Sequence, residues 1–112
     1  MKAKEIYDLA MSLLGYSENT VIQKRSVPII NKIYLEMFTV FKKPNEEFVS
    51  IKSLGDSINL PDDVLTVVMP LGVAAGIAVG EGDGELQQYF AYEYDRARKR
   101  YGQISTVKDV TL

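Results

Sequence analysis

The sequence predicts a mainly α-helical bundle of about four helices, with a small β-hairpin between helices two and three and an extended C-terminal tail. Apolar residues recur at helical spacing in the first third of the chain, and a run of small apolar residues occupies 64–80. A change to alternating apolar and polar residues at 47–60 predicts the hairpin. With 112 residues, we expect one helical domain at 1–102 and an extended arm at 103–112.

The first two helices are predicted from apolar stripes and from the residues that bound them. The stripe of the first helix, residues 2–14, consists of Ile6, Leu9, Ala10, Leu13 and Leu14. Gly15 then ends this helix. Capping residues at 16–20 precede a second helix that runs to about Phe41. Because Pro28 cannot donate a backbone hydrogen bond, we expect it to kink this helix or to open its second half.

The third helix follows the predicted hairpin. Leu60-Pro61-Asp62-Asp63 opens it, with acidic residues at the end of the helix that favours negative charge. Pro70 predicts a kink or a break between two shorter helices. The hinge Gly82-Asp83-Gly84 ends this part of the chain, and Asp83 or Gly84 caps the fourth helix.

The fourth helix carries an aromatic stripe. We expect its core face to consist of Leu86, Tyr89, Phe90, Tyr94, Ala97 and Tyr101. Tyr92 lies off this stripe, which predicts an exposed side chain and a candidate subunit contact. Beyond Gly102 the residues show no helical period, so the sequence predicts an extended arm there.

Three glycines at four-residue spacing, Gly72, Gly76 and Gly80, predict close helix packing. Each glycine costs a helix about 1 kcal/mol, so their face should pack tightly against another backbone. Two interpretations stay open, an intrachain contact with the first or second helix and a contact with a neighbouring subunit. The same spacing would suit a membrane helix pair. The acidic flanks of this segment lack membrane anchors, so we expect no membrane span.

Composition argues against catalysis and metal binding. The chain has no cysteine and no histidine, so disulfides, thiolate metal sites and histidine-dependent nucleophiles are excluded. The acidic clusters lack the order of oxygen donors found in an EF-hand. We therefore predict no enzyme activity, no catalytic residue, no cofactor and no metal site. An enzyme or small-ligand binder is the least favoured function class.

A basic cluster, Arg96, Arg98, Lys99 and Arg100, lies in the second half of the fourth helix. These cations could contact a phosphate backbone, which gives an alternative function as a small helical nucleic-acid-binding module. The other interpretation is a solvated helix end whose cations offset the helix dipole. The net charge of −2 argues against a surface devoted to nucleic acid.

The order of the elements resembles the small head–tail connector, or adaptor, proteins of tailed bacteriophages and prophages. The resemblance rests on Leu14-Gly15, Ile30-Asn31, Leu60-Pro61, "PLGVAAGIAVGEGD" (Pro70–Asp83) and "YFAYEYDRARKRYG" (Tyr89–Gly102), and covers most of residues 5–102. It implies a helical bundle with a protruding hairpin or loop. It also implies a non-catalytic structural protein of the particle that joins the portal to the tail and extends the DNA channel.

The resemblance further implies the partners and the location. The partners are the portal protein, a tail-side connector or stopper protein, and other copies of the chain in a ring, usually of twelve. DNA passes through this ring without sequence specificity. An isolated copy can remain a monomer until its template triggers assembly. The protein is expected in the virion, and in the bacterial host cytoplasm during assembly.

The hairpin and the arm are the expected donors of subunit or portal contacts, because both carry alternating apolar residues and unpaired β-type backbone. Exposed apolar side chains in these segments would be unfavourable on a monomer. The residues predicted to make such contacts are Phe48, Val49, Ile51, Tyr92, Ile104, Val107, Val110 and Leu112. The arm in particular resembles the segment with which such proteins grip the portal or a neighbouring subunit.

Overall fold

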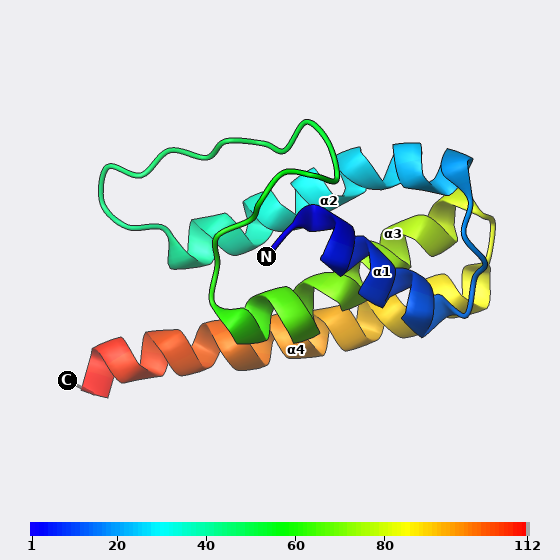
Figure 1. Ribbon diagram of the computed structural model, residues 1–112. Coiled ribbons are helices and arrows are strands. Elements are labelled where there is room, and N and C mark those ends of the chain that lie inside the picture. Colours follow the sequence, from blue (N-terminus) through cyan, green and yellow to red (C-terminus); the bar gives the residue numbers. More distant parts are fainter. Residues whose placement is uncertain (112) are drawn as a thin grey trace.

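The computed structural model describes the backbone of residues 1–111 and the side chains of residues 1–101. In this part of the chain the structure is mainly helical (Figure 1). The elements in order are α1 (Ala3–Leu14), α2 (Thr20–Phe41), the π-helical segment η1 (Val64–Val68), α3 (Met69–Gly80) and α4 (Gly84–Thr111). The prediction of a mainly α-helical bundle of about four helices is confirmed.

Helix α3 is the centre of the bundle, because it packs against α1, α2 and α4. Its side chains are apolar around the whole circumference, and Val73, Ala74, Ile77 and Ala78 are all buried. A helix that is apolar on every side is stable only when neighbours cover it. The three other helices provide this cover, and each contributes one apolar stripe to a shared core.

The helix ends follow local rules that can be read from the sequence. Gly15 ends α1 in the left-handed conformation, with φ of 72°. The Asn19 side chain accepts hydrogen bonds from the backbone N–H groups of Val21 and Ile22 at the start of α2. Asp83 caps α4 by accepting a hydrogen bond from the Leu86 N–H. These caps fix where three of the helices begin or end.

The buried face of α1 differs from the predicted stripe by a rotation of the helix. Tyr7 and Met11 are buried, whereas Leu9 is 39% exposed and Leu13 is 48% exposed. The prediction that Leu9 and Leu13 face the core is therefore wrong. The observed stripe consists of Ala3, Ile6, Tyr7, Ala10, Met11 and Leu14 and packs mainly against α3, which leaves the two leucines outside it.

Two of the prolines, Pro28 and Pro70, lie within helices, and neither breaks its helix. α2 continues through Pro28 from Thr20 to Phe41. Pro70 occupies the first turn of α3, where its missing N–H matters least. The widened turn of η1 immediately precedes it, and the Met69 N–H bonds to the Val64 carbonyl. A π-type turn is one of the ways in which a helix absorbs a local insertion.

Residues 47–60 do not form the predicted β-hairpin. No strand occurs in the part of the chain that the structure describes, and the only β-type pairing there is an isolated bridge between Lys2 and Ser57. Residues 42–61 form a long loop that returns beside α2 and passes the N-terminus (Figure 1). The alternating residues reach the helices instead of each other, because the loop backbone is hydrogen-bonded by α2 and by the start of α1.

The predicted extended arm at 103–112 is wrong for the backbone as far as Thr111, because α4 has the bounds Gly84–Thr111. Extending an existing helix adds a hydrogen bond per residue without a new nucleation step. The single Gly102 and the β-branched residues reduce helix propensity without preventing this extension. The predicted contact residues Ile104, Val107, Val110 and Leu112 have side chains outside the described residues.

Candidate subunit-contact surfaces

The loop between α2 and η1 is held by one side chain of α2. The Asn31 amide donates a hydrogen bond to the Ile51 carbonyl oxygen at 2.9 Å. Its oxygen accepts one from the Ile51 N–H at 2.7 Å. An asparagine amide presents a donor and an acceptor side by side, as a peptide group does, so it pairs with extended backbone. This pairing replaces the cross-strand partner that a hairpin would have supplied.

The rest of the loop is tied to the start of α1. The N–H groups of Ala3 and Lys4 donate to the carbonyl oxygens of Asp56 and Leu54 at 2.9 and 2.8 Å. The free N–H groups of the first helical turn thus find partners in the loop. The Asp56 carboxylate also accepts backbone hydrogen bonds from Lys52 and Ser53, and these bonds lower the pKa of Asp56. The segment around Asp56 is therefore a well-defined turn.

The three predicted contact residues of the loop have different environments. Ile51 is 5% exposed and belongs to the core, so the prediction that it is exposed is wrong. Phe48 is half-buried, and its ring packs edge-on against Tyr34 and Phe38 with centroid distances of 4.9 and 5.5 Å. Val49 is 72% exposed. Of the three, Val49 is the side chain that the loop presents fully to its surroundings.

Helix α4 presents two tyrosines on its outer face. Tyr92 is 64% exposed, in agreement with its place off the core stripe. Tyr89 is 57% exposed, so its predicted core position is wrong. Phe90 takes the buried position beside it, and the rings of Tyr89 and Phe90 pack edge-on at 5.0 Å. The outer face of α4 is therefore more aromatic than the sequence pattern predicts.

Tyr94 joins α4 to α2. Its hydroxyl donates a short hydrogen bond to the Glu36 carboxylate, and the Arg98 guanidinium lies over its ring at 5.5 Å. Burial, together with the neighbouring Glu36, raises the pKa of the Tyr94 hydroxyl. This hydrogen bond lies at the edge of the core and connects α4 to α2.

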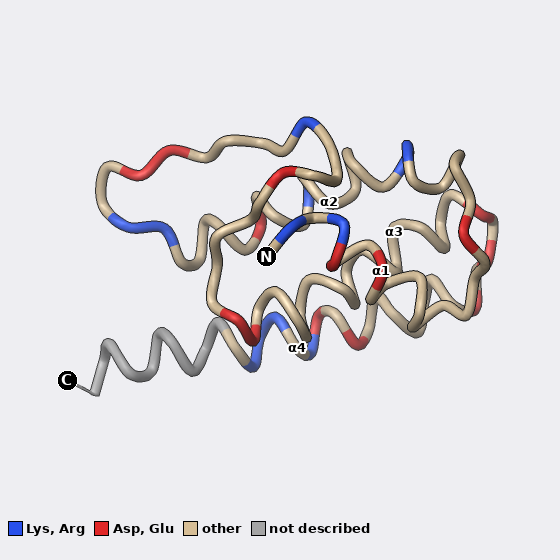
Figure 2. The backbone as a smooth tube through the Cα atoms, viewed as in Figure 1, with Lys and Arg blue, Asp and Glu red and all other residues tan. Residues whose placement is uncertain are grey.

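The basic cluster of α4 is largely paired with carboxylates. Arg98 and Lys99 lie 3.3 and 3.0 Å from oxygens of Asp95. Arg96 lies 3.5 Å from Glu93 and also over the Tyr92 ring. In Figure 2 the acidic residues of this part of the helix come directly before the basic ones. The charge available for a phosphate backbone is reduced accordingly.

The glycine face packs within the chain at two of its three positions. A Cβ atom at Gly72 would lie 2.9 Å from Ile33 and Tyr94 side-chain atoms, and at Gly76 it would lie 2.6 Å from Ile29 Cγ2. These distances match the predicted close packing, with α2 as the principal neighbour. At Gly80 the nearest such atom, of Arg25, is 3.9 Å away, so close packing does not explain this glycine.

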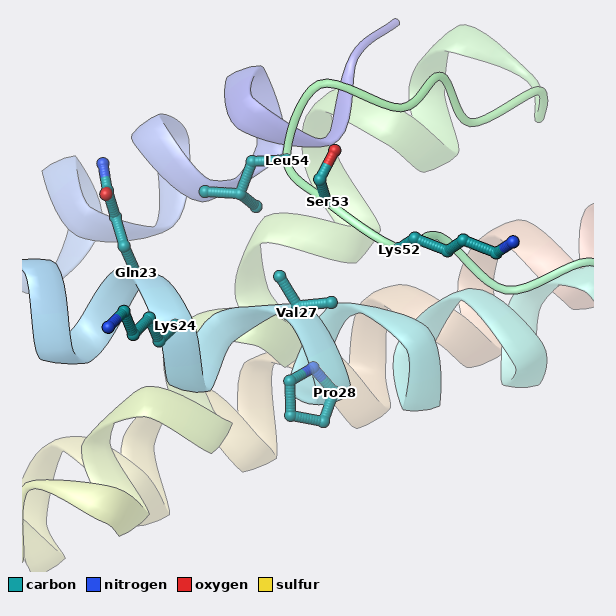
Figure 3. Close-up of a pocket in the computed structure, with 7 residues that line it drawn as sticks. All are labelled: Gln23, Lys24, Val27, Pro28, Lys52, Ser53 and Leu54. Carbon is teal, nitrogen blue, oxygen red and sulfur yellow. The ribbon is translucent and has the colours of Figure 1, made fainter.

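A shallow depression of about 530 Å³ lies between α2 and the loop (Figure 3). It is lined by Gln23, Lys24, Val27, Pro28, Lys52, Ser53 and Leu54. In Figure 3 the Lys24 and Lys52 side chains point away from each other. A ligand pocket needs polar groups that converge on one point, and this depression does not provide them.

The described part of the chain lacks two further features. Among its residues, no group of three or more acidic side chains is arranged to hold a metal ion. None of its helices has an apolar stretch long enough to cross a membrane.

Comparison with known proteins gives no match: no family model fits the chain, and no curated protein or solved structure matches it significantly. Its function has to be inferred from its own residues and their geometry.

Sequence reasoning missed the role of Asn31 and the outward positions of Leu9 and Leu13. Asn31 carried a signal, because asparagine is a poor helix former and lies among isoleucines in the middle of α2. Such a residue inside a helix suggests a specific hydrogen bond. No such signal marked the two leucines. The predicted and the observed stripes share Ile6, Ala10 and Leu14, so the helical spacing of apolar residues fits both.

Proposed function

We propose that this chain is a non-catalytic structural protein of a phage or prophage particle. It acts as a head–tail connector or adaptor that joins the portal to the tail and extends the DNA channel. The observation that carries the proposal is the placement of exposed apolar side chains. The most exposed of these, Val49 and Tyr92, lie on a long loop and on the outer face of the last helix, away from a complete core.

The physical argument starts from that core. All four helices bury apolar side chains against one another, so the fold needs no partner to close its centre. Single exposed apolar side chains are common on protein surfaces, whereas several gathered on one surface indicate a contact with another protein. A small helical protein that carries such side chains on its long loop and on the outer face of its last helix is suited to a structural role in a particle, where it contacts other proteins. The resemblance to connector proteins implies that the partners in those contacts are the portal, the tail and neighbouring copies.

The same proposal places the protein in the virion, as one copy of a ring that is usually of twelve subunits. Its neighbours there are the portal protein and a tail-side connector or stopper protein. DNA passes through the ring without sequence specificity. A mildly acidic chain is suited to this task, because packaged DNA has to slide past the lumen and not adhere to it.

The test is assembly on a portal. Portal rings from the same phage or prophage genome are mixed with the purified chain, and complexes are separated by size and imaged by electron microscopy. We expect the chain to remain with the portal as an additional ring. Val49→Ser should weaken this retention. Val21→Ser, the same substitution at an exposed valine of α2, should not. A chain that never associates with the portal would overturn the proposal.

The segment 103–112 is the proposed portal-gripping element, and its deletion tests that role separately. Every described core residue precedes Gly102, so we expect the truncated chain to keep the bundle and its unfolding midpoint and to lose only the helical signal of the removed end of α4. Its retention on the portal should be lost. Normal assembly of the truncated chain would assign portal binding to another surface.

A further inference from the structure

Two helix faces remain uncovered in the single chain, and they are complementary to each other. The α1 face consists of Glu5, Asp8, Leu9 and Leu13. The α4 face consists of Tyr89, Tyr92, Arg96 and Lys99. Each face is apolar at one end and charged at the other, with carboxylates on α1 and cations on α4. We propose that the α1 face of one copy binds the α4 face of a second copy of this chain.

The spacing of the residues matches when the two helices run antiparallel. On α1 the leucines lie toward the C-terminus and the acids toward the N-terminus, whereas on α4 the tyrosines come first and the cations follow. At about 1.5 Å rise per residue, Leu13 to Glu5 spans about 12 Å and Tyr89 to Arg96 about 10.5 Å. Leu13 then lies against Tyr89, Leu9 against Tyr92, and Glu5 against Arg96.

The existing ion pairs of these faces do not oppose the contact. Asp8 is paired with Lys4 at 2.7 Å and Arg96 with Glu93 at 3.5 Å, each within its own helix. Exposed pairs of this kind contribute little stability, so the charges can exchange partners at low cost. Interfacial charge complementarity sets the orientation of the two helices, and the leucine and tyrosine side chains supply the buried apolar area.

The contact is of the head-to-tail kind. The two faces are different surfaces, so each copy that uses its α1 face still has a free α4 face. Such contacts continue from copy to copy and close into a ring when the rotation allows it. The inference deepens the proposed function and rests on it, since a ring of connectors needs a contact of this kind, and it names the surfaces that meet.

Cross-linking tests the pairing directly, because the chain has no cysteine of its own. Leu9→Cys copies are mixed with Tyr92→Cys copies and treated with a short bismaleimide at high protein concentration. We expect a covalent dimer from the mixture, little dimer from either variant alone, and a ladder of oligomers from a chain carrying both changes. The control mixture pairs Tyr92→Cys with Leu35→Cys, a comparably exposed leucine of α2. Equal yields from the control, or strong dimers from Leu9→Cys alone, would overturn the proposal.

Charge reversal provides the second measurement on the cysteine-bearing chain. Glu5→Lys or Arg96→Glu alone should lower the yield of the ladder several-fold. Both reversals in one chain should restore it, because attraction returns with the signs exchanged. Circular dichroism checks that each variant stays helical. No effect of the single reversals would refute the antiparallel orientation of the two helices. Retention on the portal is measured separately, so a failure of the connector function is distinguishable from a failure of this contact.

Discussion

The side-chain amide of Asn31 pairs with both backbone hydrogen-bonding groups of Ile51, across 20 residues of sequence. This pairing lets the Ile51 side chain enter the core while the loop around it stays irregular. It also sets the position from which Val49, two residues earlier, projects outward. One asparagine therefore links the packing of α2 to the surface that we propose for assembly.

The first prediction concerns this link. Asn31→Ala removes both hydrogen bonds and leaves the Ile51 N–H and carbonyl without partners. We expect the free energy of unfolding to fall by about 1–3 kcal/mol. Denaturant titration measures this loss, and limited tryptic cleavage at Lys52 should become faster. Asn59→Ala, a change at an exposed asparagine of the same loop, should alter the stability by less than about 0.5 kcal/mol. An equal loss in both variants would refute the structural role of Asn31.

The second prediction compares two glycines of α3. Gly76→Ala places a methyl group 2.6 Å from Ile29 Cγ2, which forces the helices apart, so we expect a loss of about 1–3 kcal/mol. Gly80→Ala meets no atom closer than 3.9 Å and should be neutral or stabilising by up to about 1 kcal/mol, because alanine favours the helix. Thermal unfolding of both variants measures the difference. Shortening the neighbour in Gly76→Ala/Ile29→Ala should recover part of the first loss, and its failure to do so would point to another cause.

The third prediction concerns alkaline pH. Burial, with a hydrogen bond to Glu18, raises the pKa of Tyr7 from 10.0 to about 12. Because the folded-state pKa lies above the unfolded value, the fold favours the protonated phenol. This contribution is complete below pH 10 and is lost as the pH rises toward 12. Unfolding titrations across this window should show a steeper loss of stability for the wild type than for Tyr7→Phe. Parallel curves would contradict the burial argument.

The fourth prediction separates the connector from the nucleic-acid-binding alternative. The chain has a net charge of −2, and the connector proposal gives these cations no DNA-binding role, so we expect Arg96→Ala/Lys99→Ala to leave DNA affinity at low salt unchanged. Fluorescence anisotropy with a labelled duplex over a range of salt concentrations measures this. A salt-dependent affinity that falls several-fold in the variant would favour the nucleic-acid-binding module instead.

Local sequence signals predicted the fold class well, for reasons that are visible in single segments. Gly15 and Asn19 fix helix ends through contacts with their own neighbours in sequence. The small-residue run of α3 could be stable only inside a bundle, so its central place follows from composition alone. The close approach at Gly72 and Gly76 follows from the same composition.

Tertiary structure decided the features that depend on a distant partner. The alternating residues at 47–60 are compatible with a strand, but hydrogen bonds with Asn31 of α2 and with the start of α1 hold them as an irregular loop. Leu9 and Leu13 are as apolar as their buried neighbours, and Tyr89 has an aromatic ring like the buried Phe90, so the packing of α1 and α4 against α3 determines which of them turn outward. Helix periodicity and helix caps are local properties, so the order of the residues is enough to specify an apolar helical bundle. The packing of the helices determines which apolar side chains stay exposed and available to a partner, because the burial of a side chain depends on every surface that meets it.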